Sequence, residues 1–361
     1  MQYIKFLILA IRVRQRTDLY QTNFMKPSFH SYLANDPFQD PVLLVDFQFT
    51  RRALLFDAGD LRQVPSRILL RVTDLFISHR HMDHFADFDR LIRLNLGRGK
   101  CLRVYGPEGI IAGVAAKLSA YNWNLVSNYT EAIEIEVIEM ISEQTVNRAL
   151  FHCQNEFRLQ PHQSQSIDDK MVLSDTSIQV RATILDHGLP CLGFSIQEPM
   201  HVNIWKNRLM EMDLEVGPWL TLLKQAVMMN APDETPIQVQ RSNDSTLIET
   251  MPLKVLKEKI VKIVPGQHIG YLVDVSFNDE NLHRLLPLFH NADHLYIEAP
   301  FLHRDLDHAI RKRHLTAKQA GTIAKLASVK SFTLCHFSPR YAADASLLQQ
   351  EAEEAFDSTK S

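Results

Sequence analysis

Short apolar runs rich in β-branched and aromatic residues, separated by polar turns, mark the first half of the chain and predict strands. They lie at Val42–Phe47, Ala53–Phe56, Leu75–Ile77, Leu102–Tyr105 and the alternating Ile133–Val137. After the third run the period changes, and apolar residues recur at helical spacing: Phe85, Phe88, Leu91, Ile92 and Leu96. This spacing predicts a helix that ends at Gly97.

The second half of the chain alternates between predicted strands and predicted helices. The strands lie at Ile178–Leu185, Ile269–Val273, Leu295–Ile297 and Phe332–Leu334, with helices between the later ones. Thr316 and Gln319 have the spacing of a capping box, which predicts that a helix begins there. Its buried face would consist of Ala320, Ile323, Ala324 and Ala327. Mixed strands and helices without a repeat period predict the stacked layers of an α/β protein.

One segment breaks this pattern and predicts a largely helical insertion. From Glu198 to Lys262 the strand pattern gives way to Met- and Leu-rich helical stretches, a polar passage from Pro232 to Thr250, and a basic run. The basic run consists of Lys254, Lys257, Lys259 and Lys262. These lysines form either a solvated helix face or contacts to nucleic-acid phosphates. The methionines are expected to fill gaps in apolar packing: Met200, Met210, Met212, Met228 and Met229.

The insertion divides the chain into segments. Residues 25–197 form the first half of a core, 198–262 the insertion and possible substrate-binding arm, and 263–350 the second half of the core. Residues 1–24 and 351–361 are expected to be peripheral tails.

The composition is that of a folded protein with a large core, since 45% of the 361 residues are hydrophobic. A formal net charge of −3 excludes a surface covered in basic charge, so contacts with nucleic acid would have to come from local patches. The four cysteines include no Cys-x-x-Cys pair, which excludes a disulfide framework or zinc ribbon and favours a reducing cytoplasm. They are Cys101, Cys153, Cys191 and Cys335.

The N-terminal apolar stretch Tyr3–Ile11 is too short to span a membrane. Most of the positive charge beside it follows it, whereas a signal peptide places that charge first, so we expect no secretion. The first strand pattern begins well after this stretch, and Met25 is therefore a second candidate for the start of translation.

The strongest chemical signal directly follows the predicted strand Leu75–Ile77. The sequence His79-Arg80-His81-Met82-Asp83-His84 contains four potential metal ligands. In an extended segment His79 and His81 share a face, while Asp83 and His84 fall where the chain turns into a helix. One loop could therefore serve two neighbouring metal ions.

Further candidate ligands stand at the ends of predicted strands, where a rigid scaffold positions functional loops. His187, Asp274 and His336 each end or follow such a strand, although each alone could be a structural residue. With the motif they supply five histidines and two aspartates, enough for two zinc-type ions with open positions for water and substrate. A set rich in His and carboxylate favours catalysis over a closed structural site. Asp57, after another strand, either orients a ligand imidazole or opens a turn.

The chain resembles the metallo-β-lactamase superfamily and, within it, the ribonuclease Z family. The resemblance rests on matching motifs spread across the predicted core. They are Phe56-Asp57-Ala58-Gly59, the His79–His84 motif, Asp186–Phe194, Tyr271–Asp274, Ile297-Glu298-Ala299-Pro300-Phe301, His314-Leu315-Thr316-Ala317 and Leu334–Tyr341. It implies a four-layered αββα sandwich of metallo-β-lactamase type.

The resemblance also implies a mechanism and a ligand set. His79, His81 and His187 would hold one Zn²⁺, and Asp83, His84 and His336 the other, with Asp274 bridging; Mn²⁺ is a possible substitute. A hydroxide shared by the two ions would attack the phosphate, and Asp83 would also orient it. Glu298 and His314 would assist departure of the ribose oxygen, His314 as the general acid.

By this likeness the substrate is precursor tRNA, whose 3′ trailer a ribonuclease Z removes, and the enzyme is a homodimer. Some features depart from the family: Met82 replaces a usual glycine, and Phe85-Ala86-Asp87-Phe88 replaces a segment containing glycine and proline. A Pro-x-Lys-x-Arg-Asn-like stretch and a glycine-rich arm are not evident. A small-substrate metallo-hydrolase, such as a cyclic-nucleotide phosphodiesterase, is therefore the alternative. A non-catalytic RNA-binding or assembly protein is a third possibility, although such proteins commonly lose ligands.

Overall fold

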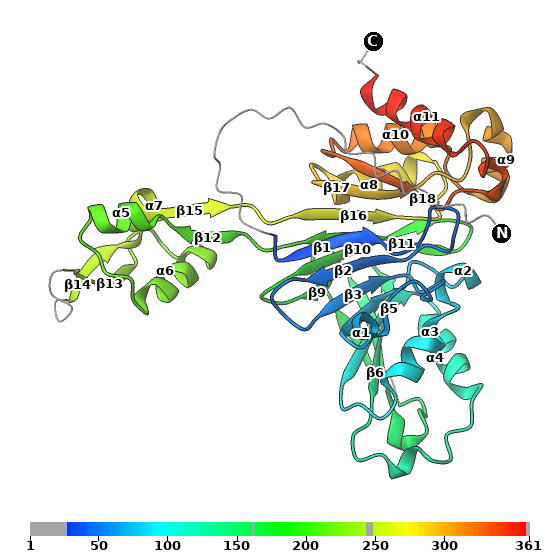
Figure 1. Ribbon diagram of the computed structural model, residues 1–361, viewed down its shortest axis with the longest axis horizontal. Helices are drawn as coiled ribbons and strands as arrows, with labels where there is room; N and C mark the ends of the chain where they lie inside the picture. Colours follow the sequence, from blue (N-terminus) through cyan, green and yellow to red (C-terminus); the bar gives the residue numbers. More distant parts are fainter. Residues whose placement is uncertain (1–26, 161–162, 243–247, 359–361) are drawn as a thin grey trace, which may run out of the picture.

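Two mixed β-sheets lie face to face at the centre of the molecule (Figure 1). The computed structural model describes residues 27–160, 163–242 and 248–358; the N-terminal apolar stretch and Met25 lie outside these ranges. The first sheet holds eight strands in chain order. They are β1 (Phe29–Leu33), β2 (Leu43–Phe47), β3 (Ala53–Phe56), β4 (Val72–Phe76), β5 (Cys101–Pro107), β6 (Glu134–Ser142), β7 (Thr145–His152) and β8 (Gln163–Ser166). Strands β3 to β6 are parallel, and the flanking strands are antiparallel.

The second sheet has six strands in the order β18-β17-β16-β11-β10-β9. Their bounds are β9 (Met171–Ser174), β10 (Gln179–Asp186), β11 (Pro190–Gln197), β16 (His268–Leu272), β17 (His294–Glu298) and β18 (Phe332–Cys335). The last three are parallel to one another, and β11 runs antiparallel to both β10 and β16. Strand β10 therefore points the same way as β16, β17 and β18.

An aromatic cluster fills the space between the two sheets. Phe76 stacks on Phe56 and Tyr105 at centroid distances of 4.5 and 4.4 Å. Phe194 of the second sheet meets Phe56 and Phe76 edge-on at 5.4 and 5.6 Å. These rings belong to one buried cluster drawn from both sheets. Large rings in offset and edge contact resist sliding, so the cluster fixes the position of one sheet against the other.

Helices cover the outer face of each sheet, so the layers run helices, sheet, sheet, helices (Figure 1). The first sheet is covered by α1 (Ser66–Leu69), α2 (Met82–Phe85), α3 (Phe88–Asn95) and α4 (Ile110–Ser119), with η1 (Val126–Asn128) and η2 (Cys153–Asn155). The second is covered by α8 (Asp279–Phe289), α9 (Leu306–Lys312), α10 (Ala317–Leu326) and α11 (Ala345–Asp357), with η3 (His303–Asp305) and η4 (Pro339–Tyr341). Each helical layer packs on its sheet through a separate apolar cluster.

Residues 201–264 project from this body as an arm (Figure 1). Its stem is the antiparallel pair β12 (His201–Ile204) and β15 (Val261–Val264). Beyond the stem lie α5 (Lys206–Glu211), α6 (Trp219–Met228), the pair β13 (Pro236–Gln240) and β14 (Ile248–Pro252), and α7 (Leu253–Ile260). The arm has an apolar cluster of its own, which includes Leu223, Val239 and Leu256.

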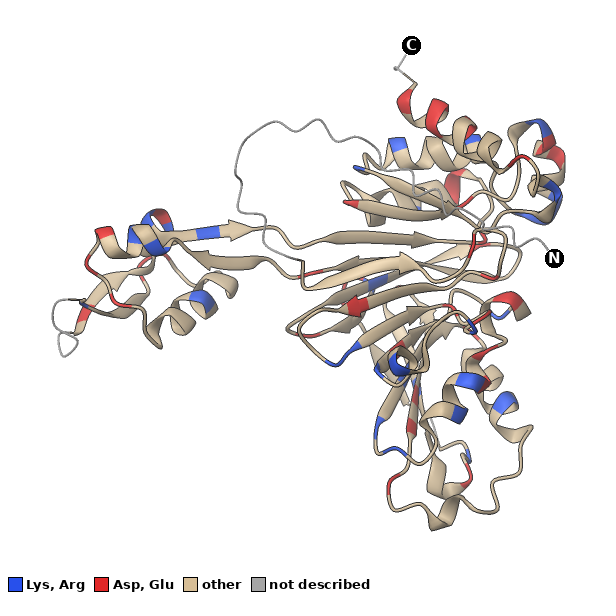
Figure 2. Cartoon of the chain, in the orientation of Figure 1, with Lys and Arg blue, Asp and Glu red and all other residues tan. Residues whose placement is uncertain are grey.

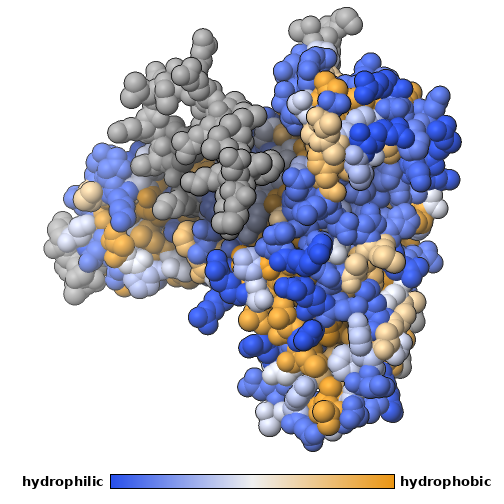
Figure 3. Space-filling model, turned by 45° about the vertical axis from the view of Figure 1, so that its right-hand side comes forward, coloured by the Kyte–Doolittle hydropathy of each residue, from blue (hydrophilic) through white to orange (hydrophobic). Residues whose placement is uncertain are grey.

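Two expectations for this segment were wrong. The insertion is not largely helical, because four strands accompany its three helices, and two of them lie within or beside the polar passage 232–250. The alternating apolar residues of β13 are too few to stand out from their polar neighbours. Most of the methionines do not fill gaps either: Met210 and Met229 are 67% and 79% exposed. Figure 3 shows apolar surface on the arm among hydrophilic residues.

The other strand predictions are confirmed to within a few residues, and the capping box at Thr316 and Gln319 is present. The helix predicted up to Gly97 is split into α2 and α3. The break falls at Asp87, whose backbone N–H donates to the Ala58 carbonyl and whose carboxylate accepts from the Leu61 N–H. Helix α11 continues to Asp357, so the tail expected from residue 351 begins inside a helix. No helix among residues 27–160, 163–242 and 248–358 is long and apolar enough to cross a bilayer.

Two glycines inside helices offer a matched test of this packing. A Cβ at Gly321 of α10 would lie 2.1 Å from the backbone oxygen of Ala352 in α11, whereas one at Gly113 of α4 would meet the flexible Arg80 side chain at 3.1 Å and the Phe85 ring at 3.6 Å. Gly321→Ala should lower the free energy of unfolding by about 1–3 kcal/mol through overpacking. Gly113→Ala should raise it by roughly 0.5 kcal/mol, because alanine favours helix. Urea unfolding of both variants measures this, and a Gly321→Ala protein at least as stable as the wild type would contradict the close α10–α11 contact.

Candidate metal centre

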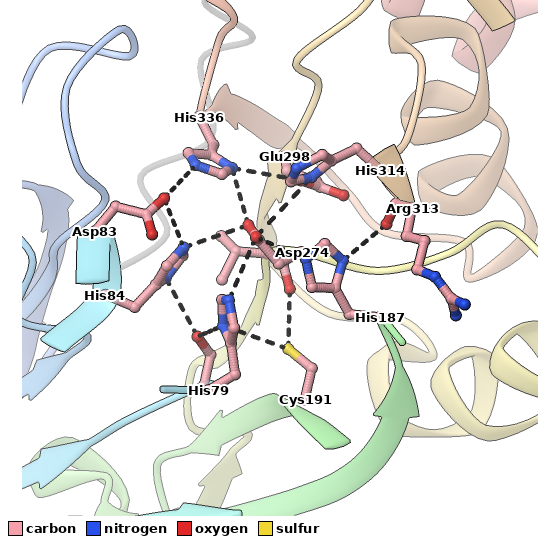
Figure 4. A network of polar contacts seen from close by, with 12 residues as sticks. His79, Asp83, His84, His187, Cys191, Asp274, Glu298, Arg313, His314 and His336 are labelled. Carbon is pink, nitrogen blue, oxygen red and sulfur yellow. Dashed lines mark hydrogen bonds and ion pairs between the residues drawn. The ribbon is translucent and has the colours of Figure 1, made fainter. Parts of the chain in front are cut away.

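The ends of strands from both sheets meet at one rim, and the predicted ligands lie there (Figure 4). His79 and His81 follow β4, and Asp83 and His84 begin α2. From the second sheet, His187 follows β10, Asp274 follows β16 and His336 follows β18. Because these strands point the same way within each sheet, their carboxyl ends share an edge, which is where loops of α/β proteins form sites.

The first ligand cluster consists of His79, His81, His187 and Asp274. Each offers one ligand atom, and these atoms lie within 4.8 Å of one another. The Nε2 atoms of His79 and His187 lie 3.4 and 3.3 Å from Oδ2 of Asp274. Three imidazoles and a carboxylate oxygen at this spacing match the ligand types of a catalytic zinc ion.

The second ligand cluster consists of Asp83, His84 and His336, again with ligand atoms within 4.8 Å of one another. Oδ2 of Asp83 lies 3.5 Å from Nε2 of His84 and 3.3 Å from Nε2 of His336. The other oxygen of Asp274, Oδ1, faces this cluster, 3.4 Å from Nε2 of His84 and 2.9 Å from Nδ1 of His336. The two oxygens of Asp274 therefore point at different clusters.

Buried polar atoms without hydrogen-bond partners show that these residues suit cations. Within the described part of the chain, Nε2 of His79, Nε2 of His84 and Oδ1 of Asp274 are all buried and make no hydrogen bond, although Nδ1 of His336 lies 2.9 Å from Oδ1. A buried polar atom left in this state costs about 1–3 kcal/mol. The lone pairs of these atoms converge on a common space that contains no hydrogen-bond donor. A metal ion bound in that space would satisfy them.

Nδ1 of His84 and Nδ1 of His187 are each held by a fixed partner. Asp57, which is fully buried, accepts hydrogen bonds from Nδ1 of His84 at 2.9 Å, from the Ser78 N–H at 2.7 Å and from the Tyr271 hydroxyl at 2.9 Å. Nδ1 of His187 donates to the backbone carbonyl of Arg313 at 2.9 Å. A carboxylate or carbonyl on one nitrogen selects the tautomer that leaves the other nitrogen free to bind metal.

Burial keeps one ligand in the neutral form that binds metal. Desolvation lowers the pKa of His79 to about 2, the neighbouring His84 lowers it further, and the opposing pull of Asp274 is smaller. For His84 itself, burial also lowers the pKa, but the carboxylates of Asp274 and Asp57 outweigh burial and raise it.

A carboxylate–imidazole pair, Glu298 and His314, adjoins both clusters. With Asp274 and His336 it forms a third group of potential ligands, whose atoms also lie within 4.8 Å of one another. Nδ1 of His314 donates to Oε2 of Glu298 at 2.7 Å, and Oε1 of Glu298 accepts from the N–H groups of Val275 and Leu315, each at 3.1 Å. Burial raises the pKa of Glu298, but His314 and the hydrogen bonds outweigh it and lower the pKa to about 2. For His314, burial lowers the pKa and the Glu298 charge more than compensates. An ionised carboxylate thus supports a protonated imidazole, which is the form of a general acid.

The predicted residues differ in where they lie. The structure brings together the seven predicted ligands, with Glu298, His314 and Asp57 around them. The four lysines lie elsewhere, on α7 and β15 of the arm. Sequence reasoning missed Ser78 and Tyr271, which hold Asp57. Ser78 directly precedes His79 and Tyr271 opens the motif Tyr271–Asp274, but neither position indicates a contact with Asp57.

Comparison with known proteins finds relatives over most of the chain. The ribonuclease Z of Deinococcus radiodurans is 29% identical over 291 residues, which cover 80% of this chain and 83% of that protein. The ribonucleases Z of Synechocystis sp. and Treponema pallidum are 26% and 27% identical, with 85% and 84% of this chain covered and 81% and 84% of theirs. No protein-family model matches the chain.

Among solved structures, human tRNase Z, short form, aligns over 87% of this chain and 93% of its own length, with a TM-score of 0.48 and 19% identity. The metallo-β-lactamase fold protein YhfI of Bacillus subtilis aligns over 88% and 86%, with a TM-score of 0.49 and 16% identity.

Gly59 offers a test of the second ligand cluster, because a Cβ there would lie 1.8 Å from the backbone oxygen of Asp83. Gly59→Ala should therefore displace the start of α2 and lose one of the two metal ions that we expect per chain. Gly99→Ala, whose Cβ would meet nothing closer than 3.6 Å, should keep both. Elemental analysis of the metal-loaded proteins measures this. Full metal content in Gly59→Ala would show that the position of Asp83 does not matter for binding.

Proposed function

We propose that this chain, which is a metal-dependent hydrolase of the ribonuclease Z and metallo-β-lactamase family, is a phosphodiesterase that removes the 3′ trailer from precursor tRNA. The observation that carries the proposal is the Glu298–His314 pair beside two clusters of metal ligands that share Asp274. An acid at this position suits a reaction whose leaving group is a poor one, such as a ribose oxygen. Similarity to proteins named ribonuclease Z supports tRNA as the substrate.

In this proposal the site holds two divalent ions, with Zn²⁺ favoured by the ligand types and Mn²⁺ as the substitute. His79, His81 and His187 would hold one ion and Asp83, His84 and His336 the other, and Asp274 lies between the two sets. Two such ions activate water at neutral pH and offset the charge of the phosphate in an in-line displacement.

The protein's own groups carry the remaining steps. The half-buried carboxylate of Asp83 orients the attacking water from its edge of the site. His314 donates the proton from its Nε2–H to the departing ribose O3′, and Glu298 keeps the ring in that orientation through its hydrogen bond to Nδ1. Asp57 takes no part in the proton transfer; it positions His84.

The arm is the proposed tRNA-binding element. Figure 2 shows Lys and Arg residues along α7 and β15, and the side chain of Lys262 lies over the Trp205 ring at 5.1 Å. Lys257 is paired with Asp233 at 2.9 Å, and its contribution to phosphate binding is therefore smaller. Backbone phosphates held by several lysines give binding that weakens steeply with salt. We further propose that the enzyme is a homodimer and that it is cytoplasmic, since its four free cysteines suit a reducing compartment.

The arm can be removed without touching the metal centre, because Asn203 and Lys262 are paired across its stem. Replacing residues 204–261 by an Asn-Gly turn should lower kcat/KM for precursor tRNA by about 100-fold, because phosphate contacts are lost, while hydrolysis of bis(4-nitrophenyl) phosphate changes by less than about 2-fold. Steady-state assays on both substrates measure this. Equal losses on both would make the arm a structural element. Efficient cleavage of cyclic nucleotides without tRNA cleavage would favour the small-substrate alternative.

A second prediction concerns the general acid. His314→Ala should lower kcat on precursor tRNA by about 100-fold or more but cost much less on bis(4-nitrophenyl) phosphate, because nitrophenolate leaves without a proton. Metal content should be unchanged. His308→Ala, which removes a histidine of α9 that packs on Phe301, is the matched control and should keep both activities. Similar losses on the two substrates would assign His314 a positioning role instead.

A further inference from the structure

A small pocket has His314 as one of its lining residues. It measures about 290 Å³ and is lined by Ser276, Phe277, Ile310, Arg313, His314 and Gln319. The lining comes from the loop after β16, from α9 and from the start of α10. A cavity of this size is at the lower end of the range for ligand sites and suits one small ligand, such as a nucleoside.

Two of the lining residues present apolar surface to solvent. Phe277 is 38% exposed and Ile310 is 62% exposed, although the groups around them are polar. An aromatic ring at the wall of a pocket is the usual platform for stacking an unpaired base.

Arg313 is held at the pocket by its backbone and by a glycine. It has φ of +60°, in the left-handed region where glycine is the common residue after a helix. Its side chain crosses Gly188 so closely that a Cβ there would lie 2.7 Å from Nε. The guanidinium reaches Asp186 only at 3.4 Å, and the side chain is half exposed. Most of its donors therefore remain available to a ligand such as a phosphate.

Gln319 adds a further polar group. Its Oε1 accepts from the Thr316 N–H in the capping box, which fixes the side chain. Its amide NH₂ has no protein partner among the residues that the structure describes, and Gln319 lines the pocket. A fixed amide donor beside an aromatic ring suits a heterocyclic base.

We propose that this pocket binds the nucleoside that carries the leaving oxygen, the one directly 5′ to the scissile phosphate, in an unpaired conformation. The inference rests on the proposed function, because a ribose whose O3′ receives a proton from His314 has to lie against that ring. The base stacks on Phe277, and Arg313 contacts the 5′-phosphate of the same nucleotide. Phe277 and Arg313 are thus specificity-determining residues for the proposed reaction.

The experiment uses short RNAs with one cleavage site, in which the nucleotide 5′ to the scissile phosphate has its base or is abasic. For the wild-type enzyme, loss of the base should raise KM by about 10-fold, the scale of one base stacked on an aromatic side chain. In Phe277→Ala the abasic penalty, which is the ratio of KM for the abasic RNA to KM for the intact RNA, should fall below about 2-fold. The reason is that this variant has no aromatic ring on which the base could stack. Phe277→Trp should restore it. Phe49→Ala removes an exposed phenylalanine between β2 and β3. This variant should retain the rise of about 10-fold in KM that loss of the base causes in the wild type.

Arg313→Asn removes the guanidinium while keeping a residue that tolerates the left-handed backbone. It should raise KM for both RNAs by about 5-fold, whereas Lys312→Ala, which removes the same charge one residue away, should leave KM within about 2-fold. Equal effects of the two variants would reduce the role of Arg313 to general charge.

The subsite is overturned if the abasic penalty is equal in the wild type and Phe277→Ala, or is missing in the wild type while RNA is cleaved. Failure of the proposed function has a different signature, in which the metal-loaded wild-type enzyme cleaves neither RNA; the subsite assignment then falls with it. Circular dichroism of each variant identifies loss of folding. If both variants fold, a penalty that is present in Phe277→Trp and missing in Phe277→Ala assigns base stacking to residue 277.

Discussion

A buried carboxylate surrounded by imidazoles is the constraint on which the rest of this structure depends. Asp274 is 2% exposed, and its two oxygens face different groups of histidines. A carboxylate so far from water is costly unless positive charge or donors surround it. The fold therefore has to bring side chains from distant parts of the chain around this one residue. Metal ions between the imidazoles and Asp274 would satisfy the charge and the unpartnered nitrogens together.

Neither sheet could build this centre alone. The first sheet supplies His79, His81, Asp83 and His84 and the supporting Asp57, whereas the second supplies His187, Asp274, Glu298 and His336. The interlocked rings between the sheets set the distance between these two sets. A hydrogen bond also links the two sheets directly, because the Tyr271 hydroxyl of the second sheet donates to the Asp57 carboxylate of the first. Packing far from the chemistry thus decides whether ligand atoms meet at coordination distance.

The sequence predicts local features of this protein better than features that depend on distant residues. The buried strand β3 is a continuous apolar run, and the histidine motif is contiguous, so both could be identified from short windows. The break between α2 and α3 could not, because it depends on a tertiary contact of Asp87 with Ala58. Strands β13 and β14 of the arm carry few buried residues, so the polar passage from Pro232 to Thr250 gave no strand signal. The pocket beside His314 joins Phe277 to Arg313, and no spacing rule links residues so far apart.

The central claim is that two ions sit on either side of Asp274, and anomalous diffraction from metal-loaded crystals tests it most directly. The account predicts two anomalous peaks about 3.5–4 Å apart, the separation of two-metal hydrolytic sites. One peak should be bounded by His79, His81 and His187, and the other by Asp83, His84 and His336. A single peak, or peaks away from Asp274, would contradict the account.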